Sequence, residues 1–457
     1  MGKLLALLLG LILAASVFAK EAPTVAADPV LEKRVMALAS ELRCLVCQNQ
    51  TIADSNAELA IDLTSQILGS GRSSRLFRRV VGPDAAATAT TFHYQFEDVG
   101  ILIVQASFDE TKRGEVDRRI LAEIERLKAH GPTAYELALA KNALRAEAIL
   151  GLEDAVGQAQ ALAAAEARDG YRSLGTRLAD LDKVTAEQVR EAARRFLTIE
   201  RLTLYHYAPN GSTAIDRDAA LARARSASAT PPLAELSNPL PASFTAVAPA
   251  VVSRPASEVR LANGARLIVR ERPGAPSVSV GLYFNGGRSF ESSANAGVTQ
   301  LTVASLRRGA GQRDGEEIDR SFEFLGTALA SDVSPDFLGV EMDVISANLR
   351  PALELFAEVA LRPTFPDQGV REERALQLAA IRRAFDSSIQ RPQALALADL
   401  WPTHPYGLPG AGTEDSVGAL GAADLAAWWR GHLAAEDATI VIVGDVAEGA
   451  ARELVER

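Results

Sequence analysis

The chain has 457 residues, which at about 150 residues per domain corresponds to roughly three domains. Hydrophobic residues make up 48% and charged residues 23%, and these globular proportions exclude a fibrous or globally disordered protein. Lys and Arg number 48 against 58 Asp and Glu; the net charge of −10 argues against a nucleic-acid-binding protein, which needs a basic surface. Two cysteines can form at most one disulfide, which is too few to stabilise a chain of this length, so its stability must come from packed hydrophobic cores.

Residues 1–19 have the pattern of a secretory signal peptide. Lys3 precedes an apolar run at residues 4–13, and Val17 and Ala19 occupy the −3 and −1 positions of a cleavage site after Ala19. The apolar stretch ends before it reaches the roughly 20 residues that a transmembrane helix needs. We therefore expect a periplasmic or otherwise exported protein that contacts the membrane only if the signal stays uncleaved.

A C-x-x-C pair lies at the end of the first predicted helix. An apolar stripe over residues 31–45 predicts this helix to be amphipathic. Cys44 and Cys47 lie about one helical turn apart, and Arg43 beside Cys44 favours the thiolate form that attacks disulfides. The pair either closes an inert local disulfide or supplies one attacking and one resolving thiol.

The residues around the two cysteines resemble the start of the cytochrome c-type biogenesis protein H family. The L-R-C-x-x-C-Q motif at 42–48 carries the resemblance, which covers about residues 28–63. We therefore assign residues 20–63 to a truncated helical dithiol segment. The resemblance implies that Cys44 and Cys47 are a redox pair. It also implies apocytochrome c and other cytochrome maturation proteins as partners, with haem as a ligand through this segment alone.

Separate runs of strands and helices predict an α+β domain over residues 64–210. Strands are expected at 91–97 and 101–108, with helices after them and a last strand at 202–207. The run L-G-x-G-x-S-S-R-L-F at 68–77 resembles the second domain of pitrilysin/insulinase-type zinc peptidases. In that family this domain binds substrate and holds no metal ligand. Its first strand is missing here, so the domain is truncated at its N-terminus.

Residues 211–255 read as a Pro/Ala/Ser-rich linker, in which frequent prolines exclude a central strand. Residues 256–457 form a second predicted α+β domain, with a hairpin at 259–269 around an Asn-Gly turn and a late strand at 438–443. The expected fold class is therefore α+β. It comprises two insulinase-like α/β-sandwich domains behind a short helical dithiol segment and a signal peptide.

The last domain resembles the pitrilysin/insulinase family but lacks its zinc motif. The resemblance rests on L-A-N-G at 261–264, G-G-R-S-F-E at 286–291, R-P-T-F-P at 362–366, H-P-Y-G at 404–407 and G-D-V at 444–446. Active members carry H-x-x-E-H, which places two imidazoles on zinc beside a Glu base. Here Gln300 and Ala304 occupy the His positions and Val303 the Glu position, while the third ligand falls near 378–381, where no carboxylate remains. We expect no zinc, no other certain cofactor, and no zinc-peptidase activity from this chain alone.

Other candidate residues favour structural roles. The five histidines have no partner at i,i+4, so we expect structural contacts rather than metal ligation. The pairs Glu316-Glu317 and Glu372-Glu373 are predicted to cap helix N-termini, where the helix dipole favours an anion. Trp428 and Trp429 are expected at the rim and in the core of the last long helix.

Three functions are consistent with this sequence. The first is a non-catalytic peptidase homologue that binds peptide or partners an active zinc-peptidase subunit. The second is a periplasmic thiol–disulfide oxidoreductase, or haem-lyase subunit, that uses Cys44 and Cys47 in cytochrome c maturation. The third is a gene-fusion product without a single integrated activity, because the two resemblances meet within a helix.

Overall fold

The computed structural model describes residues 55–95, 100–153, 155–168, 173, 176–207, 216–226, 231–238, 240–242, 254–387 and 389–456. The chain divides into two compact units, Met1–Glu58 and Leu59–Arg457, and nearly all described residues belong to the second. The predicted signal peptide and both Cys44 and Cys47 lie outside the described residues. Across the described ranges, no helix combines the length and apolar composition needed to cross a membrane.

The first region of the second unit is built around α3 (Ser55–Gly69) and a two-stranded antiparallel sheet. The strands β1 (Thr88–Gln95) and β2 (Gly100–Ser107) correspond to the two predicted ones. The Thr91 hydroxyl donates to the Ser65 carbonyl at 2.6 Å and joins β1 to α3. The other helices are η2 (Phe77–Val81), η3 (Glu110–Lys112), α4 (Arg113–His130), α5 (Ala134–Leu150), α6 (Ala155–Arg168), α7 (Arg177–Lys183), α8 (Ala186–Phe196), η5 (Ile199–Arg201) and α9 (Arg217–Ser226).

The two faces of this small sheet differ in burial. Leu102 and Val104 pack against separate hydrophobic clusters of this region. Phe92 pairs across the strands with Ile103, and Tyr94 with Ile101. These four side chains point the other way and are 40–50% exposed. The outward face is therefore apolar and uncovered among the described residues.

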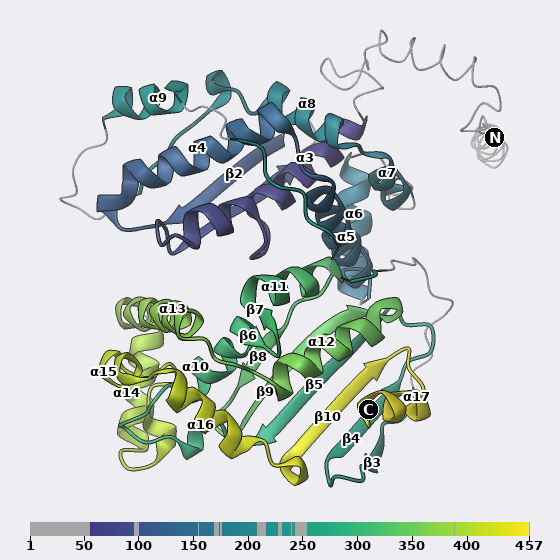
Figure 1. Cartoon of the computed structure of the whole chain (residues 1–457), viewed down its shortest axis with the longest axis vertical. Helices are drawn as coiled ribbons and strands as arrows, with labels where there is room; N and C mark the ends of the chain where they lie inside the picture. Colours follow the sequence, from purple (N-terminus) through teal and green to yellow (C-terminus); the bar gives the residue numbers. More distant parts are fainter. Residues whose placement is uncertain are drawn as a thin grey trace, which may run out of the picture. The chain divides into compact units, whose positions relative to one another are not determined.

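The second region contains one six-stranded mixed sheet (Figure 1). Its strands are β3 (Ser257–Arg260), β4 (Arg266–Glu271), β5 (Ser277–Asn285), β8 (Ala330–Val333), β9 (Phe337–Ile345) and β10 (Ala438–Gly444). They are ordered β3-β4-β10-β5-β9-β8, and β10 pairs parallel to β4 and antiparallel to β5. The predicted hairpin at 259–269 is present, and Gly264 adopts the positive φ (92°) that its turn needs.

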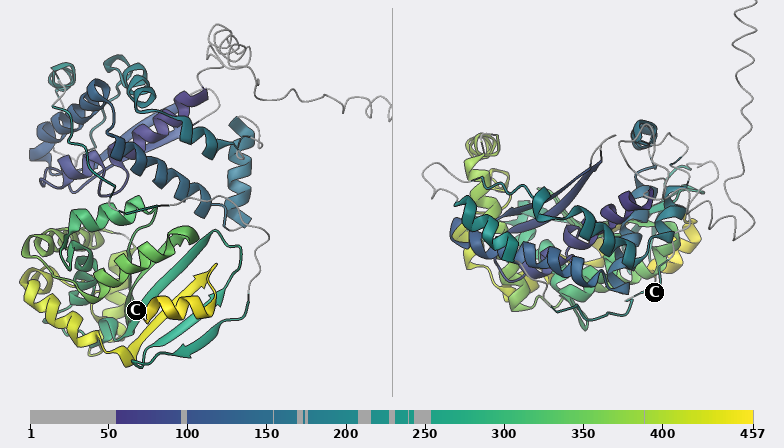
Figure 2. Two further views of the ribbon diagram at one scale, coloured as in Figure 1. Left: turned by 45° about the vertical axis from the view of Figure 1, so that its right-hand side comes forward. Right: turned by 90° about the horizontal axis from the view of Figure 1, so that it is seen from above.

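Helices cover one face of this sheet and enclose the main core. Figures 1 and 2 show α12 and α17 on the same side of the strands. Val280, Leu282 and Phe284 of β5 point into this core, and the indole N–H of Trp429 donates to the Ala360 carbonyl at 2.9 Å. The elements around the sheet are η6 (Gly287–Phe290), α10 (Val298–Ser305), η7 (Leu306–Arg308), β6 (Gly309–Ala310), β7 (Arg313–Asp314), α11 (Gly315–Phe324), η8 (Ser346–Asn348), α12 (Leu349–Leu361), α13 (Asp367–Asp386), α14 (Gln390–Leu400), η9 (Pro405–Gly407), α15 (Glu414–Ala419), α16 (Ala422–His432), η10 (Ala435–Asp437) and α17 (Glu448–Val455).

The fold class is α+β, as expected, but the strand predicted at 202–207 is wrong. This segment pairs with no strand of the described structure, and Tyr205 and Tyr207 are 80% and 91% exposed. The His206 ring instead turns inward and lies 3.0 Å from an Asp117 carboxylate oxygen of α4. A segment of high β-propensity forms a strand only when it has a partner, because its backbone N–H and C=O groups must be paired.

Part of the predicted linker is tied to the first region. The Glu235 carboxylate accepts hydrogen bonds from the N–H groups of Ala134 and Tyr135, at 3.2 and 2.7 Å. These donors belong to the first turn of α5, where N–H groups have no partner inside the helix. Glu235 therefore serves as an additional cap for α5.

Candidate functional site

Helix α10 carries the positions that the sequence analysis assigns to the zinc motif, and hydrogen bonds fix its N-terminus. Gly297 precedes the helix in a left-handed conformation (φ 88°). The buried Glu291 carboxylate accepts from the N–H groups of Gly297 and Thr299, both at 2.9 Å. An anion there satisfies unpaired helix donors and suits the helix dipole. The Glu291 carboxylate thus fixes the N-terminus of α10.

The side chains on α10 do not fit a zinc ion. Gln300 is exposed, Val303 is 2% exposed within the hydrophobic core, and Ala304 is half-buried. Zinc sites use imidazole, thiolate or carboxylate ligands, and neither Val303 nor Ala304 offers any donor atom. Among the described residues, no cluster of three or more His, Cys, Asp or Glu could hold a metal. No step of zinc-assisted hydrolysis can be built on these side chains.

Helix α13 faces α10 and carries the segment expected to hold the third ligand. Residues 378–381 there are Leu-Ala-Ala-Ile. One position earlier, the buried Gln377 amide donates to the carbonyls of Gly297 and Ala411, at 3.0 and 2.9 Å. An amide nitrogen that bridges two backbone carbonyls stabilises the packing of α13 against the start of α10.

The described histidines are held by separate local partners. His93 Nδ1 lies 2.7 Å from Asp62 Oδ1, and His432 Nδ1 lies 2.8 Å from the Trp428 carbonyl. His404 Nδ1 accepts from the Tyr406 N–H at 3.2 Å. These contacts are the structural ones that the sequence predicts for them.

Within the glycine-rich run at 68–77, residues 70–74 form the loop that follows α3, and Glu323 of α11 binds the backbone of this loop. The N–H groups of Arg72 and Ser73 donate to the two Glu323 carboxylate oxygens, at 2.6 and 3.2 Å. Gly71 has φ 77°, and a Cβ added there would lie 2.6 Å from Glu323 Oε1. Glycine is therefore required at position 71, both for the backbone conformation and for the close approach of the carboxylate.

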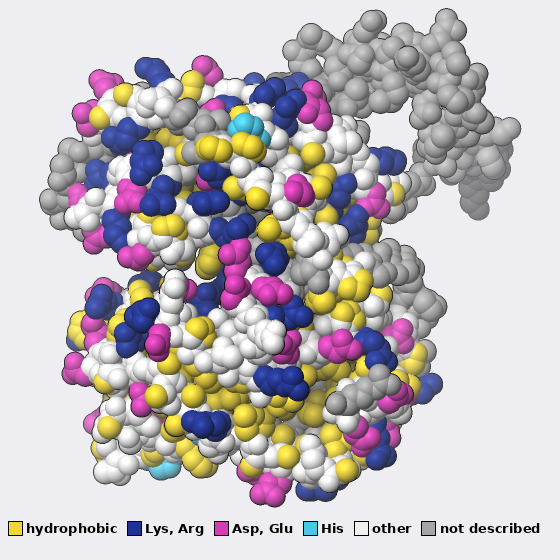
Figure 3. Space-filling model, viewed as in Figure 1, with side chains coloured by type: hydrophobic (Ala, Val, Ile, Leu, Met, Phe, Trp, Pro, Cys, Tyr) yellow, Lys and Arg dark blue, Asp and Glu magenta, His cyan; other side chains and the backbone are white. Residues whose placement is uncertain are grey.

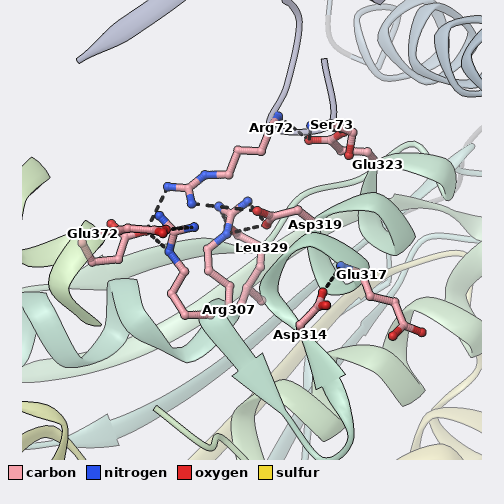
Figure 4. A network of polar contacts seen from close by, with 11 residues as sticks. Arg72, Ser73, Arg307, Asp314, Glu317, Asp319, Glu323, Leu329 and Glu372 are labelled. Carbon is pink, nitrogen blue, oxygen red and sulfur yellow. Dashed lines mark hydrogen bonds and ion pairs between the residues drawn. The ribbon is translucent and has the colours of Figure 1, made fainter. Parts of the chain in front are cut away.

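The Arg72 side chain continues from this loop into a network of alternating charges (Figure 4). Its guanidinium donates to Glu373 of α13 at 3.0 Å and lies 3.8 Å from Asp319 of α11. Arg307 donates to Asp319 at 2.8 Å, and Arg308 lies 2.8 Å from Glu373. The prediction that Glu372 and Glu373 cap a helix is wrong, because α13 begins at Asp367 and these residues sit one turn further on. They pair instead with Arg308 and Arg72.

A second arginine of the loop is fixed to α5. The Arg75 guanidinium makes two hydrogen bonds to the Glu136 carboxylate, at 2.7 and 2.8 Å, and a third to the Gly131 carbonyl at 3.0 Å. Its side chain is only 2% exposed, so this bidentate pair is well shielded from water. The two arginines of the loop thus connect α5 with α11 and α13.

Glu323 has no cationic partner among the described residues, and its pKa is raised. Among the described residues it forms no ion pair, and its acceptors are filled by backbone N–H groups. Burial, and secondarily the negative charge of Asp319, raise the pKa of Glu323 to about 7, although the hydrogen bonds from Arg72 and Ser73 oppose this. Glu323 therefore changes charge near neutral pH.

A cavity of about 380 Å³ lies beside this loop, between α3, α5 and the strands β8 and β9. Most of its wall is apolar, from Ile67, Leu139, Ala140, Ala143, Ala146, Leu150, Ala328, Ala330 and Met342. Every charged residue in the described lining is a carboxylate: Glu136, Glu147, Glu323, Glu341 and Asp343. Burial and the nearby Asp62 raise the pKa of Glu147. The cavity therefore suits an apolar ligand that carries positive charge.

The strand β8 borders the cavity and is an edge of the six-stranded sheet. The Ser334 N–H donates to the Phe337 carbonyl at the turn between β8 and β9. Hydrogen-bonded and non-hydrogen-bonded pairs alternate along an antiparallel ladder. Since Ser334 is hydrogen-bonded to Phe337, the backbone N–H and C=O groups of Ser331 and Val333 point away from β9. These outward groups could pair with an added strand.

The sequence predicted only part of this site. The glycine-rich run pointed to the loop, but nothing in the spacing of residues 316–323 or 372–373 indicated that their carboxylates meet it. The cavity joins residues from 66 to 343, and only the folded chain brings them together.

Two family models match separate parts of the chain. Residues 7–75 match the family described as cytochrome C biogenesis protein, beyond the predicted 28–63 in both directions. Residues 266–414 match insulinase, peptidase family M16. The chain therefore joins a biogenesis-like segment to an insulinase-like one.

Individual relatives agree with the second match. An uncharacterised zinc protease of Bacillus subtilis is 19% identical over 186 residues, which cover 41% of this chain and 46% of that protein. Cytochrome b-c1 complex subunit 1 of Bos taurus is 23% identical, covering 43% of this chain and 41% of that subunit. A peptidase M16 inactive domain from Pseudomonas fluorescens is a solved structure with 28% identity and a TM-score of 0.42, covering 44% and 49% of the two chains. This chain spans less than half the length of the curated relatives it matches.

Proposed function

We propose that this chain binds an extended peptide without cleaving it, as the non-catalytic partner of an active zinc-peptidase subunit. The observation that carries the proposal is the cavity beside the edge strand β8. This strand contacts α10, where Val303 and Ala304 offer no ligand atom for zinc. A peptide laid along β8 would pair with the outward backbone groups of Ser331 and Val333 and reach the apolar wall with alternate side chains.

The lining favours peptides that carry Lys or Arg. Glu147, Glu341 and Asp343 contribute negative charge without a basic residue in the described wall. Tyr283 donates to Glu341 at 3.0 Å, which holds this carboxylate on the open face of the sheet. The carboxylates would attract a basic side chain of the peptide electrostatically, whereas they would repel an acidic peptide.

Partnership with an active subunit is supported by the names of relatives. One is a subunit of the cytochrome b-c1 complex and another is the beta subunit of a probable mitochondrial-processing peptidase from Arabidopsis thaliana. Both are components of multi-subunit assemblies. In Figure 3, acidic and basic side chains are intermixed over the visible face, so this face offers no continuous surface of one charge for non-specific attraction.

Fluorescence anisotropy with labelled ten-residue peptides tests the binding. A peptide with alternating Leu and Lys should bind, and the same peptide with Glu in place of Lys should not. Ser331→Pro removes an outward N–H without breaking the β8–β9 ladder and should weaken binding at least about tenfold, while Ser331→Ala should bind normally. Equal binding by the Pro variant would contradict strand addition, and chelator-sensitive cleavage of the peptide would contradict the non-catalytic role.

The second candidate function is thiol–disulfide exchange by the N-terminal segment, favoured by the match over residues 7–75. The Cys44 thiolate would attack a disulfide of the partner, which forms a mixed disulfide and releases one partner thiolate. Cys47 would then attack Cys44, which leaves the partner reduced and Cys44 and Cys47 joined as a disulfide. In that role the chain would work in the periplasm after export through residues 1–19, with haem contact through this segment alone. Cys44→Ser in the reduced chain should abolish reduction of a disulfide-bonded partner peptide; unchanged reduction would overturn the proposal.

A mass measurement separates both roles from a gene fusion without integrated activity. The mature chain from its native host should have a mass near 48.5 kDa less about 2 kDa for the signal peptide. A two-dalton difference on reduction would identify a Cys44–Cys47 disulfide. Recovery of separate fragments only would assign the two segments to different proteins.

A further inference from the structure

Helix α14 lies exposed at the margin of the second region, away from β3 and β4 (Figure 1). It contacts α13 and η9, yet it contains no buried residue, and only Leu397 of its 11 residues is half-buried. An isolated helix of about this length is marginal in water, and most helices in proteins are stabilised by packing of one face. The exposed side of α14 is therefore a candidate contact surface.

The inward side of α14 is the side of Leu397. Trp401 follows the helix and meets the Tyr406 ring of η9 edge to face, with the ring centroids 5.9 Å apart. A Cβ added to Gly407 of η9 would collide with the Trp401 carbonyl oxygen, so the packing at this end is close. At about 100° per residue, Leu397 and Trp401 point within about 40° of each other. Side chains on the opposite side of the helix therefore point away from the domain.

The outward side carries Arg391, Leu395 and Asp399, which are all exposed and four residues apart. They point about 120° to 200° away from Leu397. Exposed apolar side chains adjoin this line on one flank: Ile389 (76%), Pro392 and Leu400 (67%). The outward side of α14 thus has a cation at its start, apolar residues at its centre and an anion at its end.

Arg391 and Asp399 form no ion pair among the described residues. The Arg391 guanidinium lies over the exposed Phe385 ring, with its Cζ 3.7 Å from the centroid. The two charged residues are about 12 Å apart along the helix axis, too far to bond to each other. Both charges therefore remain available to a partner surface.

We infer that α14 pairs with α14 of a second copy of this chain, antiparallel about a two-fold axis at Leu395. Leu395 is midway between Arg391 and Asp399, so a two-fold axis there sets each Arg391 opposite an Asp399. The two Leu395 side chains meet at the centre, with one ion pair on each side. A contact between identical copies needs a surface that is complementary to itself, and the line of cation, apolar residue and anion has this property.

The size of the contact indicates a weak, reversible dimer. A helix of this length spans about 16 Å, and one helix pair buries less than the about 1,200 Å² of a standard interface. We therefore expect a Kd of about 10 to 100 µM. None of the residues on the outward side of α14 lines the cavity beside β8, so the pairing does not depend on the proposed peptide binding.

Sedimentation velocity of the full chain from about 2 to about 200 µM tests the pairing, and the dimer fraction should rise over this range. Arg391→Asp creates two like-charged contacts and should weaken association at least about tenfold, as should Asp399→Arg. Leu395→Glu places two carboxylates at the axis and should abolish the dimer. Leu361→Glu, at an exposed position of α12 outside the contact, should associate like the wild-type chain.

The decisive measurement mixes the two charge variants. The Arg391→Asp chain presents two anions and the Asp399→Arg chain two cations, so an antiparallel pair with one chain of each kind has two attractive contacts. The equimolar mixture should therefore form the dimer that neither variant forms alone.

Several results would overturn the inference. They are a wild-type chain that stays monomeric, a mixture no more associated than its components, a dimer that survives Leu395→Glu, or a dimer lost in the Leu361→Glu control. All the changed residues are exposed, so the variants should fold, and far-UV circular dichroism verifies this. A chain that dimerises as expected but binds no peptide would contradict the proposed function and leave this inference standing.

Discussion

The two regions of the described unit use related elements but differ in how completely their sheets are built. The second region has six strands, helices over one face and one large core. The first has two strands, several small hydrophobic clusters and an uncovered apolar face around Phe92 and Ile103. The comparison teaches that strand number sets how much core a sheet can enclose, because each added strand contributes another row of inward side chains.

The largest effect is expected in the core of the second region. Trp429 is 1% exposed and donates its indole N–H to the Ala360 carbonyl. Trp429→Ala should lower the free energy of unfolding by about 3 to 5 kcal/mol, measured by urea denaturation. Trp428→Ala, at a half-buried position on the same helix, should lower it by less than half as much. Equal losses would mean that this core is looser than its burial indicates.

The corresponding test of the first region removes a charge from a shielded pair. Arg75→Ala removes both guanidinium donors of the Glu136 carboxylate, which keeps only the Thr133 N–H, and it removes the donor to the Gly131 carbonyl. We expect a loss of about 3 kcal/mol in urea denaturation. Arg78→Ala removes an ion pair with the exposed Glu316 and should cost less than about 1 kcal/mol. If Arg75→Ala proves as mild as its control, the small clusters, and not the arginine, hold this region together.

Between the regions, the stability should depend on pH through Glu323. Its raised pKa means that the folded chain gains stability below pH 4.5 and loses it as the pH rises to about 7. Relative to Glu323→Gln, the wild-type chain should lose about 2 to 3 kcal/mol over that interval, as followed by urea denaturation at each pH. A difference that does not vary with pH would show that Glu323 is solvated in the folded state.

The smallest change in the free energy of unfolding is expected when one buried hydroxyl is removed from each region. Thr302 of α10 is fully buried, and its hydroxyl has no partner among the described residues. Thr302→Val should therefore raise the free energy of unfolding by about 1 kcal/mol. In α3 the equally buried Thr64 hydroxyl donates to the Ala60 carbonyl at 2.8 Å, so Thr64→Val should be neutral or mildly destabilising. Thermal unfolding monitored by circular dichroism can resolve the difference in sign.

Local signals in the sequence predicted much of the fold. Strand patterns predicted β1, β2 and β10, and the Asn-Gly turn predicted the β3–β4 hairpin. The Glu316-Glu317 pair lies in the first turn of α11, as predicted. The prediction of a strand at 202–207 was wrong, because a local strand pattern does not indicate whether a partner strand is present. The short helices α15 and α17 were missed, since one or two turns leave little periodicity to detect.

The candidate site was less predictable than the fold. The assignment of Gln300, Val303 and Ala304 to the zinc-motif positions rests on a local sequence motif and stays a prediction. The pairing of Arg72 with Glu373 spans 301 residues, and no local pattern encodes it. The same holds for the contact of Glu323 with the 71–74 loop, so the ionic network and the cavity emerge only from tertiary packing.

The helix α3 has a practical consequence for anyone who wishes to separate the two matched segments. The biogenesis-like match continues to residue 75, yet Leu59, Leu63 and Leu68 are buried in a core of the second unit, and Arg72 and Arg75 anchor its loop. A truncated chain that begins at residue 76 would lose all five side chains and leave β1 without its supporting helix. The end of the family match at residue 75 is therefore not a suitable truncation point. A truncated chain that keeps the second unit intact should begin before α3.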